Sequence, residues 1–278
     1  HHLLVSPQGR PGLEYLTGRG LTVKTIKHFG LGYAGGEWDG LARHLKSLGY
    51  TESQMLAASV VAPRKNRGVY DLFRERAMFP IIDLRGNVIG FGGRTMGERG
   101  PKYLNSPDTA VFKKSRNLFA LNFAKAAKED KLILAEGYMD VIALHQAGFE
   151  NAVATLGTSL TSEQSRLISQ YASQVILSYD SDEAGQKATR RAIGLFDQVG
   201  LKVRVLQMTG AKDPDEYIKK FGAGRFKLLL DGADNAVEFE LEKLRRKYDL
   251  ETADGKVSFL KEAASLLAGI QSPVEREV

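Results

Sequence analysis

The residues of this sequence best suited to chemistry are carboxylates that follow predicted β-strands. Apolar, strand-like segments end at several points of the chain, and each of three such ends is followed by aspartate or glutamate. Ligands of an open α/β sheet bind outside the carboxyl ends of its strands. We therefore expect six carboxylates to meet at one sheet edge, namely Glu136, Asp140, Asp180, Asp182, Asp213 and Asp215.

Several carboxylates at one edge predict a divalent metal site. Crowded carboxylates repel one another, and a hard cation with oxygen ligands relieves that repulsion. No Lys or Arg directly adjoins Glu136, Asp180 or Asp182 in the sequence. Asp180 and Asp182 would point to the same side if their strand continued that far, so both could reach one ion. We predict Mg²⁺, with Mn²⁺ able to substitute, and metal-dependent phosphoryl chemistry.

The carboxylates also have ordinary structural explanations. A lone Asp-x-Asp is typical of a solvated turn, and carboxylates at a helix start can act as caps, as Glu136, Asp182 and Glu183 could. Asp213-Pro214 could be a plain turn before a helix. Their recurrence on successive strands of one unit favours the metal site. The glycines that follow Glu136 and Asp182 also fit a close approach of phosphate or backbone.

Alternating strands and helices would position these carboxylates. The sequence predicts strands over 131–136, 151–157, 174–180 and 202–208, separated by helices over 138–147, 161–171 and 183–199. Apolar strands that alternate with amphipathic helices imply a doubly wound, mostly parallel sheet with both faces covered. Further helices, packed on that sheet, are predicted over 214–221, 225–230, 236–248 and 255–267.

The first part of the chain differs in pattern and in charge. Residues 1–123 carry 18 Lys and Arg against 9 Asp and Glu, a net charge of +9, whereas the remainder has a net charge of −3. Short helices are predicted over 12–20 and 41–48, and a hairpin through Arg85-Gly86-Asn87. We expect an α/β fold, α+β overall, with three units: a mixed α/β basic subdomain over 1–123, the doubly wound sheet over 124–213 and a helical subdomain over 214–278.

Composition excludes several classes of protein. The 278 residues include no Cys, which excludes disulfide scaffolds, Cys-ligated zinc and thiol catalysis. No run approaches the roughly 18 apolar residues of a membrane-spanning helix, and the first residues lack the order of a signal peptide. We expect a soluble, cytoplasmic, monomeric fragment of a longer protein that makes no membrane contact.

A basic face in the first part indicates a polyanionic partner. Residues 61–116 contain 12 Lys and Arg against 5 Asp and Glu. Cations bind phosphates and aromatic rings stack on bases, so this mixture suits single-stranded nucleic acid, although a solvated surface over core aromatics has the same composition. The cations are Arg74, Arg76, Arg94, Lys102, Lys113, Lys114 and Arg116, the aromatics are Tyr103, Phe112 and Phe119, and Arg64, Lys65 and Arg67 stay unassigned. Phe79 and Phe91, in strand-like runs, are assigned to the core.

Several motifs resemble those of a known family. EGYMD at 136–140, YDSDEAG at 179–185 and KDPDEYI at 212–218 resemble the Toprim signature of bacterial primases, topoisomerases and some nucleases. The full EGYMD string, with GTS at 157–159, resembles the replicative bacterial primases in particular. Residues 74–94 and 101–119 resemble the basic polymerase subdomain of that family. This resemblance covers essentially the whole chain and implies a DnaG-type RNA polymerase core whose Toprim domain is the unit over 124–213.

The resemblance implies an activity: synthesis of short RNA primers on single-stranded DNA, in which a 3′-hydroxyl attacks the α-phosphorus of a nucleoside triphosphate and releases pyrophosphate. Glu136, Asp180 and Asp182 are then catalytic. Asp180, Asp182 and either Asp213 or Asp215 would hold Mg²⁺. Glu136 would coordinate metal or help to deprotonate the hydroxyl.

The resemblance also implies contacts with template and nucleotide. Lys102 and Lys114 match lysines that contact nucleotide or template in this family, and Arg19 matches an arginine of the nucleotide site. By the same matching Arg94, Tyr103 and Asn105 lie along that path.

The partners implied are single-stranded DNA, nucleoside triphosphates and an RNA–DNA hybrid product. The family's zinc module is excluded by the lack of Cys, so no zinc is expected. The helicase-binding domain is expected to lie outside this chain, so the zinc module and the replicative helicase of the primosome would act through regions absent from it. The alternatives are a Toprim phosphodiesterase, that is a nuclease or topoisomerase, and a non-enzymatic nucleic-acid clamp.

Overall fold

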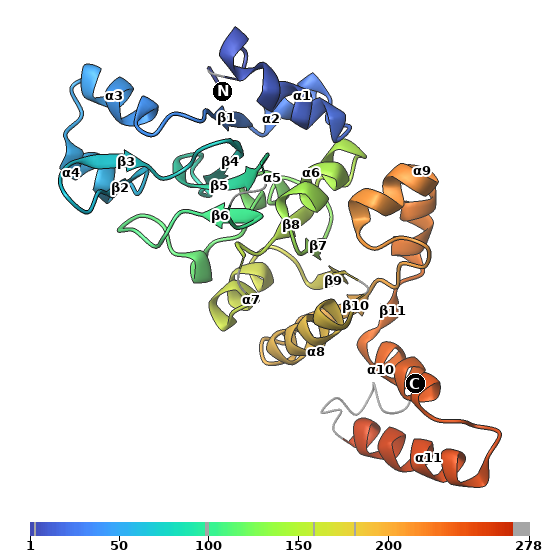
Figure 1. Ribbon diagram of the computed structural model, residues 1–278. Helices are drawn as coiled ribbons and strands as arrows, with labels where there is room; N and C mark the ends of the chain where they lie inside the picture. The colour runs from blue at the N-terminus through green and yellow to red at the C-terminus, as the bar shows by residue number, and fades with distance from the viewer. Residues whose placement is uncertain (3, 98–99, 158, 181, 269–278) are drawn as a thin grey trace.

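The described residues form two larger sheets that lie side by side, a small lobe with a two-stranded sheet of its own, and a helical extension (Figure 1). The computed structural model describes residues 1–2, 4–97, 100–157, 159–180 and 182–268. The first sheet and the lobe come from the first part of the chain, and the second sheet comes from residues 131–235. Within the described residues, no helix has both the length and the apolar character needed to cross a bilayer.

The first sheet is antiparallel and has the strand order β1-β4-β5-β6. The predicted hairpin is confirmed: β4 pairs with β5, and Asp83 Oδ1 accepts hydrogen bonds from the amides of Arg85 and Asn87 in the turn. Gly86 adopts a φ of +91° there, which favours glycine. The elements of this region are η1 (Pro7–Gly9), α1 (Arg10–Gly18), α2 (Val23–His28), β1 (Gly32–Ala34), β4 (Arg76–Ile82), β5 (Val88–Thr95) and β6 (Tyr103–Asn105).

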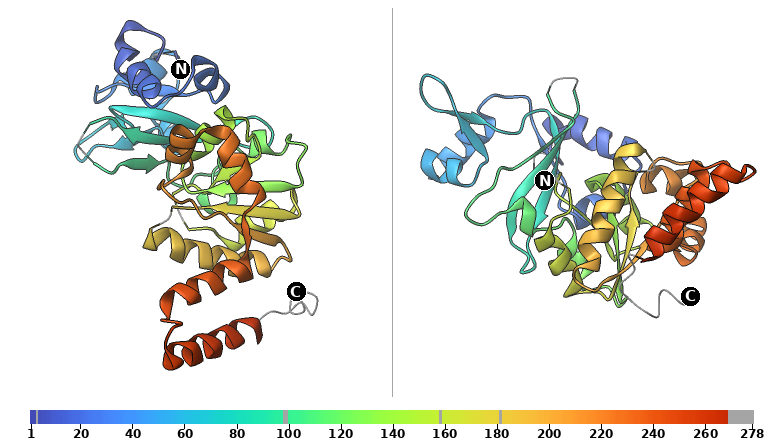
Figure 2. Two further views of the ribbon diagram at one scale, coloured as in Figure 1. Left: turned by 90° about the vertical axis from the view of Figure 1, so that its right-hand side faces the viewer. Right: turned by 90° about the horizontal axis from the view of Figure 1, so that it is seen from below.

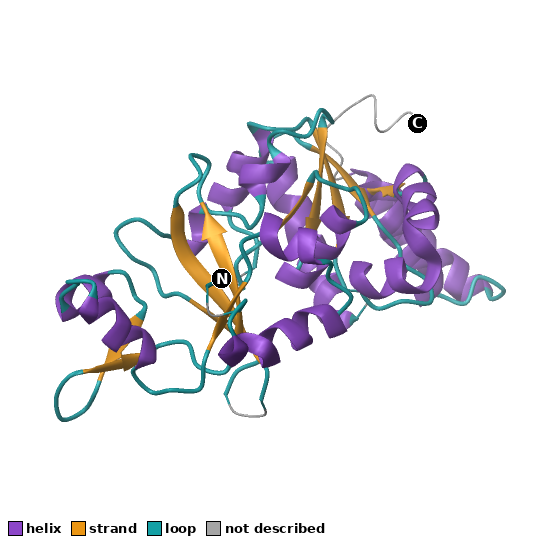
Figure 3. Cartoon of the chain, turned by 90° about the horizontal axis from the view of Figure 1, so that it is seen from above, coloured by secondary structure: helices purple, strands orange, loops and turns teal. Residues whose placement is uncertain are grey.

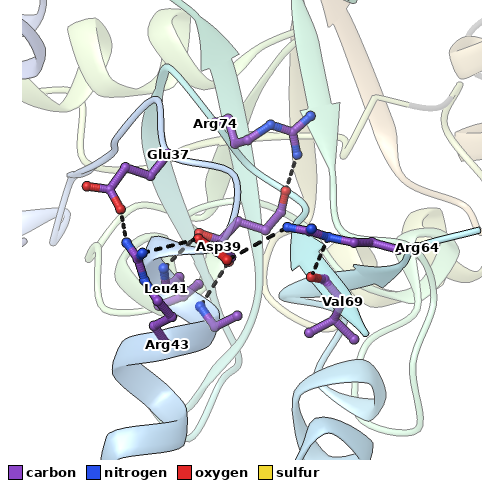
Figure 4. A network of polar contacts seen from close by, with 9 residues as sticks. Glu37, Asp39, Leu41, Arg43, Arg64, Val69 and Arg74 are labelled. Atoms are coloured by element: carbon purple, nitrogen blue, oxygen red, sulfur yellow. Dashed lines mark hydrogen bonds and ion pairs between the residues drawn. The ribbon is translucent and has the colours of Figure 1, made fainter. Parts of the chain in front are cut away.

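A small lobe, residues 36–74, lies beside the first sheet and away from the second (Figures 1 and 3). It contains α3 (Gly40–Ser47), α4 (Glu52–Ala57) and the antiparallel strands β2 (Val61–Pro63) and β3 (Val69–Asp71). Its own core consists of Ala42, Met55 and Val61. The buried Asp71 fixes α3, because its carboxylate accepts hydrogen bonds from the amides of Leu41 and Ala42 (Figure 4).

The second sheet confirms the predicted alternation of strands and helices. Its order is β11-β10-β9-β7-β8, and all pairs are parallel except β10 with β11. Between its strands run helices that the sequence predicted to within a few residues. The elements are β7 (Lys131–Ala135), α6 (Tyr138–Gln146), β8 (Ala152–Ala154), α7 (Ser162–Ser169), β9 (Gln174–Ser178), α8 (Glu183–Asp197), β10 (Lys202–Val205) and β11 (Asp234–Asn235), preceded by η2 (Lys114–Arg116) and α5 (Leu121–Ala124).

Both faces of this sheet are buried, as its apolar strands require. In β7, Ile133 packs in one hydrophobic cluster with residues of α6 and of the first sheet, whereas Leu132 and Leu134 pack in a second cluster with residues of α7 and α8. The doubly wound arrangement is therefore confirmed. It also joins the two sheets, since Phe79 of β4 belongs to the same cluster as Ile133.

The last part of the chain is mostly helical, as predicted, with one difference. The two predicted helices over 214–221 and 225–230 form α9 (Pro214–Asp231), which is broken at Gly222, where φ is +80°. Helices α10 (Ala236–Lys247) and α11 (Ala253–Ala268) extend beyond the sheet (Figure 2). The prediction of helices alone was wrong at Asp234–Asn235, which add the edge strand β11; two residues are too few for a sequence pattern.

Candidate active site

The strand order places two predicted catalytic residues at one point. The chain runs from β7 to β8 on one side and then crosses to β9 on the other side of β7. This reversal between neighbouring strands is where open α/β sheets bind ligands. Glu136 follows β7, Asp180 follows β9, and Glu136 Oε1 accepts a hydrogen bond from the Asp180 amide at 2.9 Å.

Asp182 does not continue the strand as predicted. Strand β9 ends at Ser178, and Asp182 is the N-cap of α8, where its Oδ1 accepts a hydrogen bond from the Gly185 amide at 2.9 Å. The prediction that Asp180 and Asp182 share a strand face was therefore wrong, because β9 ends before both residues; Ser181, between them, lies outside the described residues. The glycine of this motif is required, because a Cβ on Gly185 would lie 3.0 Å from Glu136 Oε1 and closer still to the Asp180 carbonyl oxygen.

Asp140 is the most strongly perturbed carboxyl group of the site. It lies in the first turn of α6, where its Oδ2 accepts a hydrogen bond from the Gly137 amide at 3.2 Å. Desolvation raises the pKa of Asp140 to about 8, and the negative charges of Asp213, Asp180 and Asp215 add to this effect. The charges that act on Asp140 thus come from the β9–α8 connection and from the start of α9, so these carboxylates lie within electrostatic range of one another.

Burial and neighbouring charges also raise the pKa of two other acids. Desolvation raises the pKa of Glu136, and the charges of Asp180 and Asp182 raise it further. Desolvation also raises the pKa of Asp180, although Lys212 opposes it with an Nζ 3.6 Å from Asp180 Oδ2. Sequence reasoning missed Lys212 because it considered only neighbours in the chain, and this lysine arrives from the segment after β10.

The acids at the start of α9 have different environments. Asp213 is the N-cap of α9, and its Oδ1 accepts a hydrogen bond from the Glu216 amide at 2.8 Å. Asp215 is buried and its Oδ2 lies 3.0 Å from Arg19 Nη2 and 2.7 Å from Lys219 Nζ. Asp215 is therefore already paired with two cations. We name the six acids Glu136, Asp140, Asp180, Asp182, Asp213 and Asp215 the carboxylate edge.

The donor chemistry of the carboxylate edge fits a hard divalent cation. Its ligands would be oxygens, and burial together with neighbouring negative charge raises the pKa of Asp140, Glu136 and Asp180. Within the described part of the chain, no three Asp, Glu or His side chains already surround one point as metal ligands. The ligand set consequently stays a proposal.

The first sheet presents basic and aromatic residues to this edge. Arg94 of β5 pairs in register with Tyr103 of β6, and Arg94 Nη1 donates a hydrogen bond to the Tyr103 hydroxyl at 2.9 Å. The Arg94 guanidinium also lies 5.9 Å from the ring centre of Tyr15 in α1. Burial raises the pKa of Tyr103, with the charge of Asp140 among the further causes. Arg19 thus contacts the carboxylate edge through Asp215, and Tyr103, to which Arg94 donates, lies within electrostatic range of Asp140.

Asn105 joins the two sheets. Its Nδ2 donates to the Leu156 carbonyl at 2.8 Å, and its Oδ1 accepts from the Tyr138 hydroxyl at 2.8 Å. Tyr138, the first residue of α6, stacks on Phe79 with ring centres 5.1 Å apart and is an organising residue that sequence reasoning missed. The Asn105 amide is thus used within the protein. Of the nearby GTS motif, Thr158 lies outside the described residues.

Three residues of the predicted basic face are buried instead. Arg76 is 6% exposed, and its Nη1 donates to the carbonyls of Gly93 and Pro101 at 2.9 and 3.1 Å. Phe112 and Phe119 are 0% and 3% exposed, so neither ring is open to a base. Phe79 is in the core as predicted, and Phe91 is only partly buried. Charge and aromatic content alone could not separate these residues from surface ones.

Among the described residues, the remaining predicted cations make no contact with the acids of the carboxylate edge. Lys102 is exposed, and Lys113 Nζ lies 3.6 Å from Asp108 Oδ2. Lys114 and Arg116 lie in η2, which α7 holds in place because Gln164 Nε2 donates to the Lys114 carbonyl at 2.9 Å. Arg74, by contrast, belongs to the small lobe.

Comparison with known families divides the chain in three. Residues 1–125 match the DNA primase catalytic core, N-terminal domain, and residues 133–218 match the Toprim-like family. Residues 237–278 match the DnaB-helicase binding domain of primase. This last match spans nearly all of α10 and the whole of α11, and it corrects the expectation that all of the helicase-binding region lies outside the chain.

Relatives and solved structures agree with these matches. A DNA primase of Clostridium acetobutylicum is 41% identical over 266 residues, which cover 95% of this chain and 44% of the relative. The chain therefore spans about half the length of the curated relatives that it matches. A DnaG primase catalytic domain bound to single-stranded DNA has a TM-score of 0.85 and 36% identity, with 99% of this chain and 88% of that chain covered.

A second structure is the RNA polymerase domain of Mycobacterium tuberculosis primase DnaG with a double-stranded DNA oligomer that has a 6-nucleotide overhang. Its TM-score is 0.88 at 30% identity, with 99% of this chain and 89% of that chain covered. The family matches, the relatives and the fold of the solved structures thus agree over almost the whole chain. The chain belongs to the DnaG-type family of bacterial DNA primases and corresponds to their Toprim-containing RNA polymerase core.

Proposed function

We propose that this chain synthesises short RNA primers from nucleoside triphosphates on single-stranded DNA. One observation supports this most: the first sheet approaches the carboxylate edge at Tyr103, the partner of Arg94, whose ring centre lies 5.9 Å from that of Tyr138 in α6 and whose pKa is raised in part by the charge of Asp140. Phosphoryl transfer depends mainly on positioning and on neutralisation of charge, and these two surfaces provide groups for both. The product would leave as an RNA–DNA hybrid.

Mg²⁺, with Mn²⁺ as a substitute, is the proposed cofactor. Asp180, Asp182 and Glu136 would hold it, and Asp213 is a better further ligand than Asp215, whose carboxylate is already paired with Arg19 and Lys219. When bound, the cation would offset the charge of the phosphate oxygens and of the attacking hydroxyl. We propose no zinc requirement for these residues.

The chain's own residues would bind and orient the reactants. Glu136, whose pKa is raised by burial and by neighbouring charges, is suited to accept the proton of the attacking 3′-hydroxyl. Arg19, whose Nη2 lies 3.0 Å from Asp215 Oδ2, and Lys102, which is exposed next to Tyr103, would bind the triphosphate. Asn105 would have an indirect role, because its side-chain hydrogen bonds hold β6 against α6.

Template contacts are assigned to the cations that remain accessible. Lys113, Lys114 and Arg116 would bind backbone phosphates, and Arg76 is left out because it is buried. We also propose that α10 and α11 take part in binding the replicative helicase, which is supported by the family match of residues 237–278.

Primer synthesis on a denaturing gel tests the proposal. Single-stranded DNA, labelled nucleoside triphosphates and Mg²⁺ or Mn²⁺ should yield short RNA with the wild type and none with Glu136→Gln. The variant should keep its affinity for single-stranded DNA, because Glu136 is not part of the basic face. Metal-dependent loss of the DNA, without RNA product in either metal, would instead indicate a nuclease.

A further inference from the structure

The small lobe contains a cavity with a basic rim and an apolar floor. The cavity has a volume of about 220 Å³ and lies between α3, α4 and the β2–β3 turn. Its rim carries four cations and two acids, namely Arg43, Lys46, Arg64, Arg67, Asp39 and Glu52. Its floor consists of residues that form or adjoin the hydrophobic core of the lobe, namely Ala42, Met55 and Val69. We name this site the lobe cavity.

Two of the four cations share one carboxylate. Arg43 Nη1 lies 3.6 Å from Asp39 Oδ1, and Arg64 Nη2 lies 3.8 Å from Asp39 Oδ2 (Figure 4). The two arginine side chains are 65% and 45% exposed, and exposed pairs of this kind contribute little to stability. Each guanidinium carries five N–H donors. Both arginines therefore keep donors for a further anion.

The other two cations are unpaired. Within the part of the chain that the structure describes, the side chains of Lys46 and Arg67 make neither a hydrogen bond nor an ion pair. Four cations against two acids leave the lining with a net charge of +2. None of these four cations has a role in the proposed synthesis of primers. The lobe cavity thus combines an excess of positive charge with accessible apolar surface.

We propose that the lobe cavity binds an acidic peptide segment of a partner protein, with an apolar side chain on the floor and carboxylates on the rim. Guanidinium and ammonium groups form strong, charge-assisted hydrogen bonds with carboxylates. The unbranched thioether of Met55 adapts to apolar side chains of different shape. This binding function goes beyond primer synthesis and does not depend on it.

The lining favours a peptide over a nucleic acid. Among the described residues that line the lobe cavity none is aromatic, so a base would find no ring on which to stack. Asp39 and Glu52 also lie among the cations, whereas a phosphate backbone is bound by a continuous basic groove. A peptide can place its carboxylates at separate points and its apolar side chain between them.

The position of the lobe fits a contact that leaves the chemical step unaffected. The lobe lies beside the first sheet and away from the second, which carries the carboxylate edge (Figures 1 and 3). The chain enters the lobe after Gly35 and leaves it before Glu75, and the Glu75 amide donates to the Gly35 carbonyl at 3.1 Å. A partner bound at the lobe cavity would therefore be held beside the protein and away from the carboxylate edge.

Methionine methyl resonances locate a bound peptide directly. The chain has five methionines, and of these Met55 lines the lobe cavity. In protein labelled with ¹³C-methyl methionine, a hexapeptide of alternating aspartate and leucine should shift the Met55 resonance, which Met55→Leu identifies by its loss. The other four resonances should stay in place. Binding that leaves the Met55 resonance unshifted, or no binding at up to about 1 mM peptide, would overturn the proposal.

Substitutions separate the lobe cavity from a general attraction between charges. In about 0.15 M salt, Arg67→Ala and Lys46→Ala should each weaken binding of the peptide about threefold, and the double variant about tenfold. Lys65→Ala is the matched control, since Lys65 is exposed in the same turn but does not line the cavity. As large a loss in Lys65→Ala as in Arg67→Ala, or unchanged affinity in the double variant, would overturn the proposal.

Two further probes test the floor and the class of ligand. A peptide with serine in place of leucine should bind about fivefold more weakly, because it offers no apolar side chain to the floor; equal affinity would overturn the proposal. The affinity for oligo(dT), measured by anisotropy, should be the same in the wild type and in the double variant. If it falls as much as the affinity for the peptide, the cavity belongs to a nucleic-acid site and the proposal is wrong.

Discussion

Replacement of Asp140 by Asn should stabilise the metal-free protein, by an amount that grows with pH. Burial and the charges of Asp213, Asp180 and Asp215 raise the pKa of Asp140 from 3.8 to about 8. Between these values the folded protein holds a proton that the unfolded chain releases. The folded state therefore loses stability as pH rises through this window, at up to about 1.4 kcal/mol per pH unit. Below pH 3.8 both states are protonated and the effect is absent.

The size of the effect follows from this window. For a rigid structure it reaches about 4 kcal/mol at pH 7, or 1.4 kcal/mol for each of about three pH units. This cost is smaller if the carboxylates move apart or if water enters between them. We therefore expect Asp140→Asn to raise the free energy of unfolding by at least about 1 kcal/mol at pH 7. The asparagine keeps an oxygen that can accept the hydrogen bond of the Gly137 amide.

Urea unfolding in EDTA at pH 5, 6, 7 and 8 measures this difference. The stability of Asp140→Asn relative to the wild type should rise steadily across the series. Asp197→Asn, which changes an exposed carboxylate of α8, should show no such trend. If Asp140→Asn and the wild type lose stability in parallel, the crowding of acids around Asp140 is not as described and the argument for the carboxylate edge fails.

Three other changes test separate contacts. Gly185→Ala should lower both the melting temperature and Mn²⁺ affinity measured by titration calorimetry, because its Cβ would push into the Asp180 carbonyl; wild-type values for both would refute the close approach. Gly92→Ala should cost about 1–3 kcal/mol in urea unfolding, since its Cβ would lie 2.5 Å from Tyr138 Cζ, and unchanged stability would show that the sheets separate freely. Burial lowers the pKa of His145, whose Nε2 lies 2.9 Å from the Ala152 carbonyl oxygen. The unfolded chain therefore binds the extra proton, and the stability of the wild type should fall below about pH 6.5. If the urea midpoint of His145→Asn falls between pH 7.5 and 5.5 by as much as that of the wild type, this explanation is contradicted.

The sequence predicted the second sheet well because local signals there agree with one another. Apolar runs such as 131–136 alternate with helices that end at glycine, and Thr161 and Asp182 are able to cap the helices that follow them. Parallel strands bring their carboxyl ends together whatever their order, so the meeting of the acids could also be predicted. The order of the strands, which makes Glu136 and Asp180 neighbours, could not be predicted.

The features that escaped prediction depend on contacts between distant residues. Arg76 looks like a surface charge in sequence, but two carbonyl groups accept its hydrogen bonds in the interior. Lys212 reaches Asp180 because these residues follow β10 and β9, which lie side by side and parallel in the sheet. Arg74 lies over the ring of Trp38 although the two residues are 36 positions apart in the chain. No periodicity or short motif encodes such pairings.

The most direct test of the central claim is to locate Mn²⁺ by anomalous scattering in crystals soaked with Mn²⁺ and a nucleoside triphosphate. We predict a peak bounded by Glu136, Asp180 and Asp182, with the triphosphate extending toward Arg19 and Lys102. A peak that persists in Glu136→Gln crystals with its ligands unchanged would assign Glu136 to proton transfer. Ordered nucleotide with no peak at the carboxylate edge would contradict the account.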